Sequence, residues 1–283
     1  MENREKQQIK EALGRFIEVK GSQNKAGNAL KGISAATLSQ IMNGNWELIS
    51  DEMWRSLSAQ LNVKNKNWNI VETTNYKDLR AFFADAQDNS LVMAITGDAG
   101  CGKTVTARQY QEDNSNVFML CCNEFWNRKL FMQELLREMG KNPAGDTVGD
   151  MMADIVSTLK RLDCPLIIMD EADKLSDQVF YFFITLYNQL EDHCGIILMA
   201  TDYLEKKVAK GLRLNKKGYK EIFSRFGRRF IHLDPTSDED IIEVCIANGI
   251  TEKDDIKEVV DESDADLRRV RRKVFAINAK KAR

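Results

Sequence analysis

The sequence has few of the residues that mark several protein classes. Its 283 residues include three prolines, two histidines and six cysteines, and no two cysteines have C-x-x-C spacing. The low proline content excludes collagen-like and proline-rich disordered chains. The shortage of histidine and paired cysteine argues against a zinc site. Most cysteines stand among apolar residues, so we interpret them as buried, reduced thiols.

The chain also lacks a long apolar segment. No uninterrupted apolar run approaches the ~18 residues of a membrane helix, and the first eight residues, Met-Glu-Asn-Arg-Glu-Lys-Gln-Gln, are too polar for a secretory signal. We therefore expect a cytoplasmic protein with no membrane partner. Hydrophobic residues make up 43% of the chain and the net charge is −2, which is ordinary for a globular protein and excludes a uniformly basic nucleic-acid coat.

The hydrophobic pattern changes near residue 64. Residues 1–63 carry helical periodicity throughout and predict a small all-α domain of four short helices. Two of these helices are expected over residues 23–30 and 35–42, each preceded by a serine that can cap it. The polar residues 64–75 are predicted to be a linker.

After the linker, short apolar runs alternate with longer amphipathic segments. This alternation predicts an α/β fold with a five-stranded parallel sheet covered on both faces. The strands are expected at 91–96, 117–121, 166–170, 196–201 and 229–233, and the helices between them at 103–113, 128–139, 147–162 and 177–191.

A glycine-rich segment between the first strand and its helix is the strongest functional signal. Gly-Asp-Ala-Gly-Cys-Gly-Lys-Thr matches G-x-x-x-x-G-K-[ST] at every fixed position. Such a loop turns backbone N–H groups toward phosphate oxygens, and the following helix adds the positive end of its dipole. Lys103 is expected to contact the β- and γ-phosphates of ATP, and Thr104 to ligate Mg²⁺. The alternative is a chance glycine-rich turn. The predicted ATP-binding residues are Gly97, Asp98, Ala99, Gly100, Cys101, Gly102, Lys103 and Thr104.

A second acidic motif follows the predicted strand 166–170. That strand ends in Asp170, and Glu171 comes next. Because the carboxyl ends of parallel strands share one edge, we expect Asp170 to lie beside the phosphate loop and hold Mg²⁺, and Glu171 to polarise the attacking water. The second acid favours ATP hydrolysis over binding alone. Taken by itself, a strand followed by Asp-Glu is also a common surface turn.

In this order the motifs resemble those of the AAA+ ATPases. The resemblance implies a sensor-1 polar residue after the strand 196–201, for which Thr201 is the first choice and Asp202 the second. It also implies a sensor-2 arginine at the start of a lid helix. Arg268, in the segment Ala-Asp-Leu-Arg-Arg-Val, is the matching residue and would reach the γ-phosphate. The alternative for Arg268 is the charged face of a C-terminal helix.

The segment Ile-Phe-Ser-Arg-Phe-Gly-Arg-Arg-Phe is similar to the AAA+ box that carries the arginine finger. In that family the finger is presented to the γ-phosphate of a neighbouring subunit, so hydrolysis requires oligomerisation. Arg225 is the first candidate, and Arg228 and Arg229 compete with it. A solvated basic turn is the alternative. Adenine contacts are expected near residues 71–76 from the family's layout alone.

The N-terminal helices resemble a phage-repressor helix-turn-helix, which would place the second helix in the major groove. Ser34, Thr37 and Gln40 are its predicted DNA contacts. A helical protein-interaction bundle is the alternative. Two basic runs support DNA contact by the second domain as well: ten basic residues and one acid lie between residues 206 and 232, and eight basic residues and no acid between 267 and 283. Solvated helix faces are the alternative for both runs. Within the first run, the predicted DNA contacts are Lys206, Lys207 and Lys210.

Domain order and length resemble the phage Mu B-like helper ATPases of DNA transposition: a helix-turn-helix domain, an AAA+ core at 76–234 and a short helical lid at 235–283. The resemblance implies an ATP- and Mg²⁺-dependent protein that forms a helical oligomer on double-stranded DNA and attracts a transposase, with hydrolysis clearing the DNA. Two other functions stay open. One is an ATP-gated transcription regulator, and the other is an AAA+ replication initiator or helicase loader.

Overall fold

The computed structural model describes residues 3–30, 32–61 and 68–281. It divides the chain into two compact units, Met1–Trp68 and Asn69–Arg283. The boundary falls inside the predicted linker, of which residues 64–67 lie outside the described part. The other end of that linker belongs to the second unit, because Thr74 donates both its backbone N–H (2.9 Å) and its hydroxyl (3.3 Å) to Asp240 Oδ1. The predicted linker is therefore too long at its C-terminal end.

The first unit consists of short helices around one apolar core. Its largest buried side chains are those of Trp54, Leu13, Leu38 and Ile41. Two serines cap helices as predicted, because each accepts a hydrogen bond from the backbone N–H three residues later. The elements are α1 (Asn3–Lys20), α2 (Gln23–Ala29), α3 (Ala35–Met42), the 3₁₀ turn η1 (Trp46–Leu48) and α4 (Asp51–Gln60).

The second unit is built on a five-stranded sheet in which every pairing is parallel, in the order β2-β3-β4-β1-β5. This confirms the predicted fold class. The last strand is shorter than predicted, because Arg228 takes a left-handed conformation (φ 58°) that keeps the chain in a turn until residue 230. The strands are β1 (Val92–Thr96), β2 (Val117–Cys121), β3 (Leu166–Asp170), β4 (Gly195–Ala200) and β5 (Ile231–His232).

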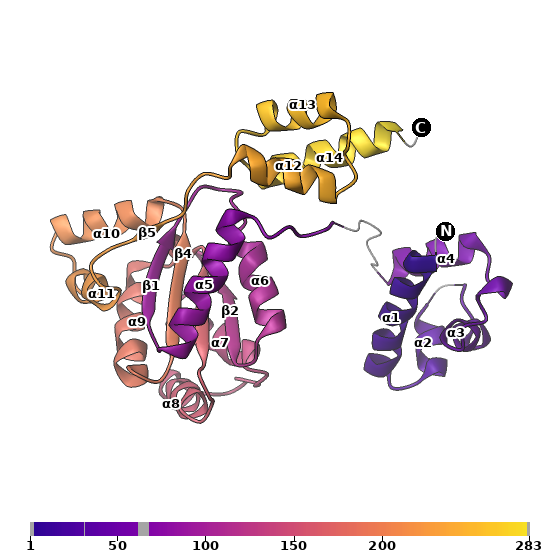
Figure 1. Ribbon diagram of the computed structural model, residues 1–283. Coiled ribbons are helices and arrows are strands. Elements are labelled where there is room, and N and C mark those ends of the chain that lie inside the picture. The colour runs from indigo at the N-terminus through magenta and orange to yellow at the C-terminus, as the bar shows by residue number, and fades with distance from the viewer. Residues whose placement is uncertain (1–2, 31, 62–67, 282–283) are drawn as a thin grey trace. The chain divides into compact units, whose positions relative to one another are not determined.

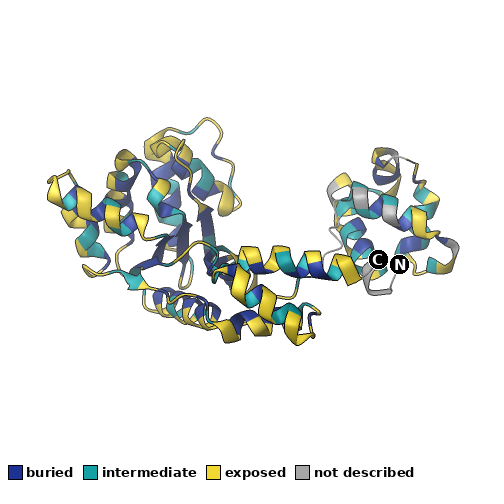
Figure 2. Ribbon diagram, turned by 90° about the horizontal axis from the view of Figure 1, so that it is seen from above, coloured by how far each residue is buried: buried dark blue, intermediate teal, exposed yellow. Residues whose placement is uncertain are grey.

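Helices cover both faces of this sheet (Figure 1). Two of them, α5 (Thr74–Asp88) and α6 (Lys103–Asp113), pack on one face. The opposite face carries α7 (Arg128–Glu138), α8 (Val148–Leu159), α9 (Asp177–Leu190), α10 (Tyr203–Arg213) and α11 (Tyr219–Arg225). Figure 2 shows the strands largely buried and the outer faces of the helices exposed. The sheet is the middle of three layers.

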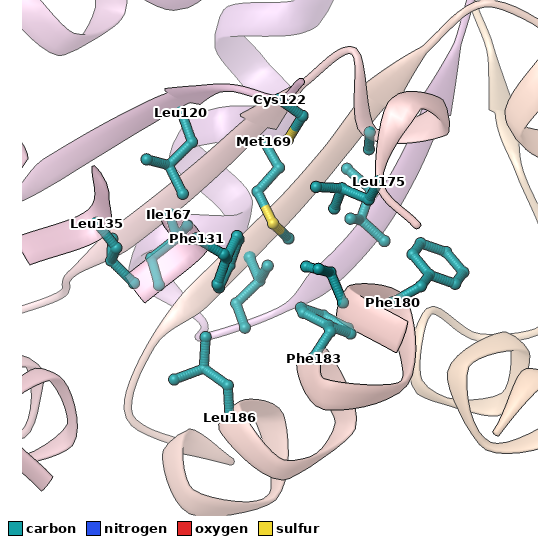
Figure 3. Packing of buried hydrophobic residues seen from close by; sticks show 14 of the residues in the cluster. Leu120, Cys122, Phe131, Leu135, Ile167, Met169, Leu175, Phe180, Phe183 and Leu186 are labelled. Atoms are coloured by element: carbon teal, nitrogen blue, oxygen red, sulfur yellow. The ribbon is translucent and has the colours of Figure 1, made fainter. Parts of the chain in front are cut away.

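Successive residues of the central strands point to opposite faces. Ile167 and Met169 of β3 pack with Phe131 of α7 and Phe183 of α9 (Figure 3), whereas Ile168 packs with the helices of the other face. Strands buried on both sides explain why the sequence shows continuous apolar runs instead of alternation.

Three further helices form a lid beyond one end of the sheet (Figure 1). They are α12 (Asp238–Ala247), α13 (Lys253–Ser263) and α14 (Leu267–Lys281). The chain around the start of α5 is bonded to this lid: Asn69 donates to Ala247 O at 2.6 Å, and the N–H of Thr74 donates to Asp240 at 2.9 Å. Residues 71–76, where adenine contacts were predicted, therefore comprise the segment before α5 and the first turn of that helix.

In the described ranges no helix is both long and apolar enough to span a bilayer. All six cysteines are free, and four of them are buried: Cys101, Cys122, Cys194 and Cys245. The same described residues contain no group of three or more histidine, cysteine or acidic side chains placed to hold a metal ion. A metal bound here would need ligands of another kind as well.

Candidate nucleotide-binding site

The glycine-rich segment forms the turn between β1 and α6. Gly100 and Gly102 have φ values of 86° and 99°, a left-handed conformation that glycine adopts at little cost. Gly97 faces Leu233 so closely that a Cβ atom would lie 2.9 Å from it. The loop therefore favours glycine at the two fixed glycine positions of the motif and at Gly100 between them. It delivers the chain to the N-terminus of α6, where the first N–H groups have no intrahelical partner.

Lys103 is folded over this loop. Its Nζ donates to the carbonyl oxygens of Gly97 (2.7 Å) and Asp98 (2.9 Å) and lies 3.5 Å from Cys101 Sγ. Only 8% of the side chain's surface is exposed. The ammonium group is thus held at the phosphate loop by carbonyl oxygens, and its contact with the β- and γ-phosphates of ATP stays a prediction.

Thr104 and Asp170 come together from different elements. Thr104 Oγ1, in the first turn of α6, donates to Asp170 Oδ2 at the end of β3 over 2.5 Å. The Asp170 carboxylate is buried, and its other oxygen accepts the backbone N–H of Glu171 at 3.0 Å. A hydroxyl and a carboxylate are hard oxygen ligands, and Mg²⁺ prefers such ligands with phosphate and water completing its shell. The donor set therefore fits Mg²⁺.

Glu171 begins the short turn η2 (Ala172–Lys174) with a left-handed backbone, φ 54°. Its side chain is half-exposed and its Oε2 lies 2.6 Å from Lys174 Nζ. The hydrogen bond to Glu171 raises the pKa of Lys174, so the lysine is charged at neutral pH. Glu171 is therefore beside the metal-ligating pair, but its carboxylate is engaged by a cation from its own turn.

The two sensor-1 candidates, Thr201 and Asp202, differ in their surroundings. Thr201 directly follows β4, and the preceding carbonyl, that of Ala200, accepts the N–H of Gly97 at 3.2 Å. Thr201 is thus anchored next to the phosphate loop. Asp202 is largely exposed and pairs with Lys206 at 2.5 Å. The geometry favours Thr201.

The lid reaches the phosphate loop through the start of α14. The N–H of Leu267 donates to Gly100 O at 3.1 Å, and Asp266 lies so close that a Cβ atom on Gly100 would be 1.9 Å from its Oδ1. The same Oδ1 accepts the N–H of Arg268 at 2.8 Å and so caps the helix. The start of the predicted sensor-2 helix is thus seated on the loop. Asp266 was not predicted, although an acid just before an apolar-basic run is a recognisable capping signal.

Arg225 lies at the other end of the sheet. Its guanidinium stacks over the Tyr187 ring of α9 (4.8 Å to the centroid) and is 3.7 Å from Glu191, which directly follows that helix. Its Nε is buried and has no hydrogen-bond partner in the described part of the chain. Arg225 and Arg229 line a cavity of about 370 Å³ along the amino-terminal half of β1.

The lining of this cavity follows β1 as far as Ala94, whereas the phosphate loop follows the carboxyl end of that strand. We therefore predict that Arg225 does not reach the nucleotide site of its own chain. The competing residues Arg228 and Arg229 are exposed next to it. The choice among the three arginines stays a prediction.

Lys207 corrects one predicted DNA contact. It points inward from α10 and donates to the carbonyl oxygens of Asp173 (2.8 Å) and Leu175. Burial lowers its pKa. Because its hydrogen bonds are made within the fold, Lys207 is not a DNA-facing residue. Lys206 and Lys210 are exposed on α10, and Lys210 pairs with no acid among the residues that the structure describes.

Tertiary contacts also change the meaning of both basic runs. In the first run, Lys216 pairs with Asp177 at 2.6 Å and Lys217 lies over the Tyr181 ring. In the second, α14 packs against the acidic helix α13, and three of its cations are paired there or at its end: Arg269 with Asp264, Lys273 with Glu258 and Glu262, and Lys281 with Asp255. The run 267–283 is thus partly neutralised within the lid, and its last two residues lie outside the described part. DNA contact by the other cations of this run stays a prediction.

In the first unit, Ser34 and Thr37 are engaged with each other. Ser34 Oγ accepts the N–H of Thr37 at 3.1 Å, and the two hydroxyl oxygens are 2.9 Å apart. Gln40 is half-exposed on the same helix, α3. α2 and α3 approach closely, since a Cβ on Gly27 would lie 3.0 Å from Ala35 N. A DNA-reading role for α3 stays a prediction.

Comparison with known proteins supports the site. Residues 86–208 match the family described as AAA domain. The chain is 26% identical over 244 residues to the ATP-dependent target DNA activator B of Escherichia phage D108, covering 83% of this chain and 76% of that protein. It is 27% identical over 205 residues to the protein of the same name from Escherichia phage Mu, covering 70% of this chain and 64% of that protein, just under two thirds of its length. An AAA domain implies a chain that binds ATP.

Proposed function

We propose that this chain, a Mu B-like AAA+ ATPase, binds double-stranded DNA in an ATP-dependent manner, forms helical oligomers on it and regulates DNA transposition. Hydrolysis of ATP then drives disassembly. The observation that carries the proposal is the contact of Thr104 with Asp170 under the phosphate loop, in a chain similar to proteins named ATP-dependent target DNA activator B. We infer a transposase as the partner from the same similarity.

Each residue of the site has a role in this proposal. Lys103 holds the β- and γ-phosphates, and Thr104 and Asp170 hold Mg²⁺, which neutralises the charge that develops on the phosphates. Glu171 accepts a hydrogen bond from the attacking water. The remaining contacts to the γ-phosphate come from Thr201 and Arg268. Backbone bonds of the residues just before them support this, since Ala200 O accepts the N–H of Gly97 and the N–H of Leu267 donates to Gly100 O.

The arginine finger comes from a second copy. Arg225 contacts Tyr187 and lines a cavity with the amino-terminal half of β1, away from the strand end that carries the phosphate loop, so one chain does not complete the site alone. A heterologous contact, in which one face of a copy meets a different face of the next, produces a helical filament if it does not close. Lys206 and Lys210 of α10 and the α3 residues Ser34, Thr37 and Gln40 are the proposed DNA contacts.

Electron microscopy of the protein with ATP, Mg²⁺ and linear duplex DNA tests this function. We expect filaments with ATP and none with ADP, and Glu171→Gln should prolong them because the nucleotide is bound but not cleaved. A protein that stays monomeric, and hydrolyses ATP at a specific rate independent of its concentration and of DNA, would contradict the proposal.

Competition between duplexes separates the main alternative. Weak sequence preference with a steep dependence of affinity on salt favours the transposition helper, because phosphate contacts dominate such binding. A large specificity ratio for one operator favours a transcription regulator.

A further inference from the structure

The backbone that carries Arg225 is anchored to α9 before and after that residue. Before it, Tyr219 of α11 donates a hydrogen bond to Asp177, at the start of α9, over 2.7 Å. After it, Phe226 is buried in the core that also contains Phe183 of α9. The backbone at Arg225 is therefore held against α9, and what remains to be placed is its side chain.

The Arg225 side chain is placed by an aromatic face. The central carbon of its guanidinium lies 4.8 Å from the centroid of the Tyr187 ring. Glu191 Oε1 is 3.7 Å from Nη1, which is beyond hydrogen-bond distance. Within the residues that the structure describes, Arg225 donates no hydrogen bond, and its Nε is buried without a partner. The guanidinium is thus held through its face and not through its N–H groups.

Contact through the face leaves the terminal N–H groups of the guanidinium available. These donors lie in the plane of the group, so an aromatic ring beneath that plane supports the cation without competing for them. A phosphoryl group that approaches in the plane then accepts two parallel hydrogen bonds. This is what is required of an arginine that acts on the γ-phosphate of another copy.

The Tyr187 ring is in turn oriented by Glu191. The tyrosine hydroxyl donates to Glu191 Oε1 at 3.0 Å, and Glu191 directly follows α9. Burial, followed by this hydrogen bond, raises the pKa of Tyr187. The hydroxyl therefore stays protonated at neutral pH and keeps donating, which fixes the ring beneath the guanidinium.

We propose that Tyr187 is a positioning residue whose ring holds Arg225 in the orientation in which it meets the γ-phosphate bound by a neighbouring copy. The inference rests on the proposed function, in which Arg225 is the arginine finger. Tyr187 acts on hydrolysis only through Arg225, so its influence falls on the nucleotide site of the next copy. A residue that only supported the fold would affect the site of its own chain as well.

Steady-state ATP hydrolysis by the full chain measures the role of the ring. Tyr187→Leu removes the aromatic face, so we expect kcat to fall about tenfold, the rate equivalent of one cation–π contact. KM for ATP should stay within about twofold, because the phosphate contacts of the chain itself are unchanged. Tyr181→Leu is the matched control: Lys217 lies over that ring at the same 4.8 Å on the same helix, and kcat should equal that of the wild type. An unchanged kcat in Tyr187→Leu overturns the proposal.

Tyr187→Phe separates the ring from the hydroxyl. This variant keeps the aromatic face and loses the bond to Glu191, so kcat should stay within about threefold of the wild type. A fall as large as that of Tyr187→Leu would assign the effect to the hydroxyl and overturn the proposal. Thermal melting of each variant identifies misfolding. Should Tyr187→Leu fail to fold, Tyr187→Met removes the ring with less loss of volume, and the same expectations apply to it.

Mixtures of two inactive variants separate a positioning role from a structural one. Lys103→Ala copies supply an intact Arg225, and Arg225→Ala copies supply an intact phosphate loop, so hydrolysis arises where the first meets the second. Adding Tyr187→Leu to the Lys103→Ala copies should lower the rate of the mixture about tenfold. Adding it to the Arg225→Ala copies should leave the rate unchanged. Equal losses in the two mixtures overturn the proposal.

Failure of the proposed function has a different signature. If the wild type hydrolyses ATP but the mixture of Lys103→Ala and Arg225→Ala does not, the shared nucleotide site is wrong, and the role of Tyr187 is overturned with it. If that mixture is active but the rate does not depend on which copy carries Tyr187→Leu, only the role of Tyr187 is overturned.

Discussion

The two ends of the parallel sheet carry different parts of the proposed hydrolytic site. At the carboxyl ends of the strands, Lys103, Thr104 and Asp170 converge and the lid touches the loop through Leu267. At the amino-terminal half of β1, Arg225 stacks on Tyr187. One end holds the proposed phosphate-binding residues, and the other holds a cation that is proposed to act on a neighbouring copy. The contrast teaches that binding and hydrolysis should be separable by mutation.

Removing the guanidinium group of Arg225 is expected to have the largest effect on the rate of ATP hydrolysis. Arg225→Ala should slow hydrolysis about 10³-fold, the magnitude typical of arginine fingers, while ATP affinity measured by calorimetry stays near that of the wild type. Arg228→Ala and Arg229→Ala are the matched controls. A mixture of Arg225→Ala and Lys103→Ala copies should regain hydrolysis, because one interface then combines an intact loop with an intact arginine. Equal loss of ATP binding and hydrolysis in Arg225→Ala would indicate misfolding instead.

A change at the carboxyl ends of the strands should weaken ATP binding, the step that precedes hydrolysis. Lys103→Ala removes charge-assisted hydrogen bonds to the phosphates, so ATP affinity should fall about 100-fold, and nucleotide-dependent DNA binding should disappear in a mobility-shift assay. Full DNA binding by this variant with ATP present would count against the role given to the loop.

A variant with a smaller expected effect on ATP affinity tests the contact between the lid and the phosphate loop. In Gly100→Ala the Cβ would meet Asp266 at 1.9 Å in a backbone that L-residues disfavour. ATP affinity should fall about tenfold, since the clash displaces α14 and costs on the order of 1–3 kcal/mol. Gly140→Ala is the control: its φ is 74° and a Cβ there meets nothing within 4 Å. Equal ATP affinities in the two variants would show that strain, not the lid, explains the loss.

The smallest expected effect concerns an acidic residue at the start of α9. Asp177, at the start of α9, accepts hydrogen bonds from Lys216 (2.6 Å) and from Tyr219 of α11 (2.7 Å), and α11 ends at Arg225. The bond from Lys216, followed by that from Tyr219, lowers the pKa of Asp177 below 3.8. The charged form therefore stabilises the fold above pH 3.8, and this contribution is lost as pH falls through the lowered pKa.

Denaturant unfolding measures this contribution. Asp177→Asn should lower the free energy of unfolding at pH 7 by less than about 1 kcal/mol, because the side chain is half-exposed. The difference from wild type should shrink as the pH falls below 3.8 and through the lowered pKa of Asp177. A difference that stays constant with pH would assign the effect to packing and not to charge.

Local signals in the sequence were sufficient for the phosphate site. The spacing of the loop, the acid at the end of an apolar strand and the polar residue after the next strand each depend on neighbouring residues and on the shared edge of parallel strands. Arg268 was placed by resemblance, and the contact of Leu267 with Gly100 brings its helix to the loop. The five strands were also predictable, because parallel strands buried on both faces leave continuous apolar runs.

The sequence alone did not predict which charged side chains are bonded to other groups in the fold. Lys207, Lys216 and Lys273 look alike within the basic parts of the sequence. In the structure, Lys207 is bonded to carbonyl groups 32 and 34 residues away, Lys216 to Asp177, 39 residues away, and Lys273 to Glu262, 11 residues away. Asp266 lies next to the phosphate loop because the lid approaches Gly100. Sequence proximity does not reveal such partners, because they are brought together only when separate helices pack.

The amino-acid order alone determined the ATP-binding chemistry and the layers of the ATPase unit, since both depend on motifs a few residues long and on the periodicity of apolar residues. Folding in three dimensions decided which cations remain exposed, which end of the sheet holds Arg225 and that Lys174 and Lys207 hold the turn of Glu171. The physical reason is range: hydrogen-bonded turns and helix caps form between near neighbours, whereas ion pairs and burial depend on elements that meet only after the chain has packed.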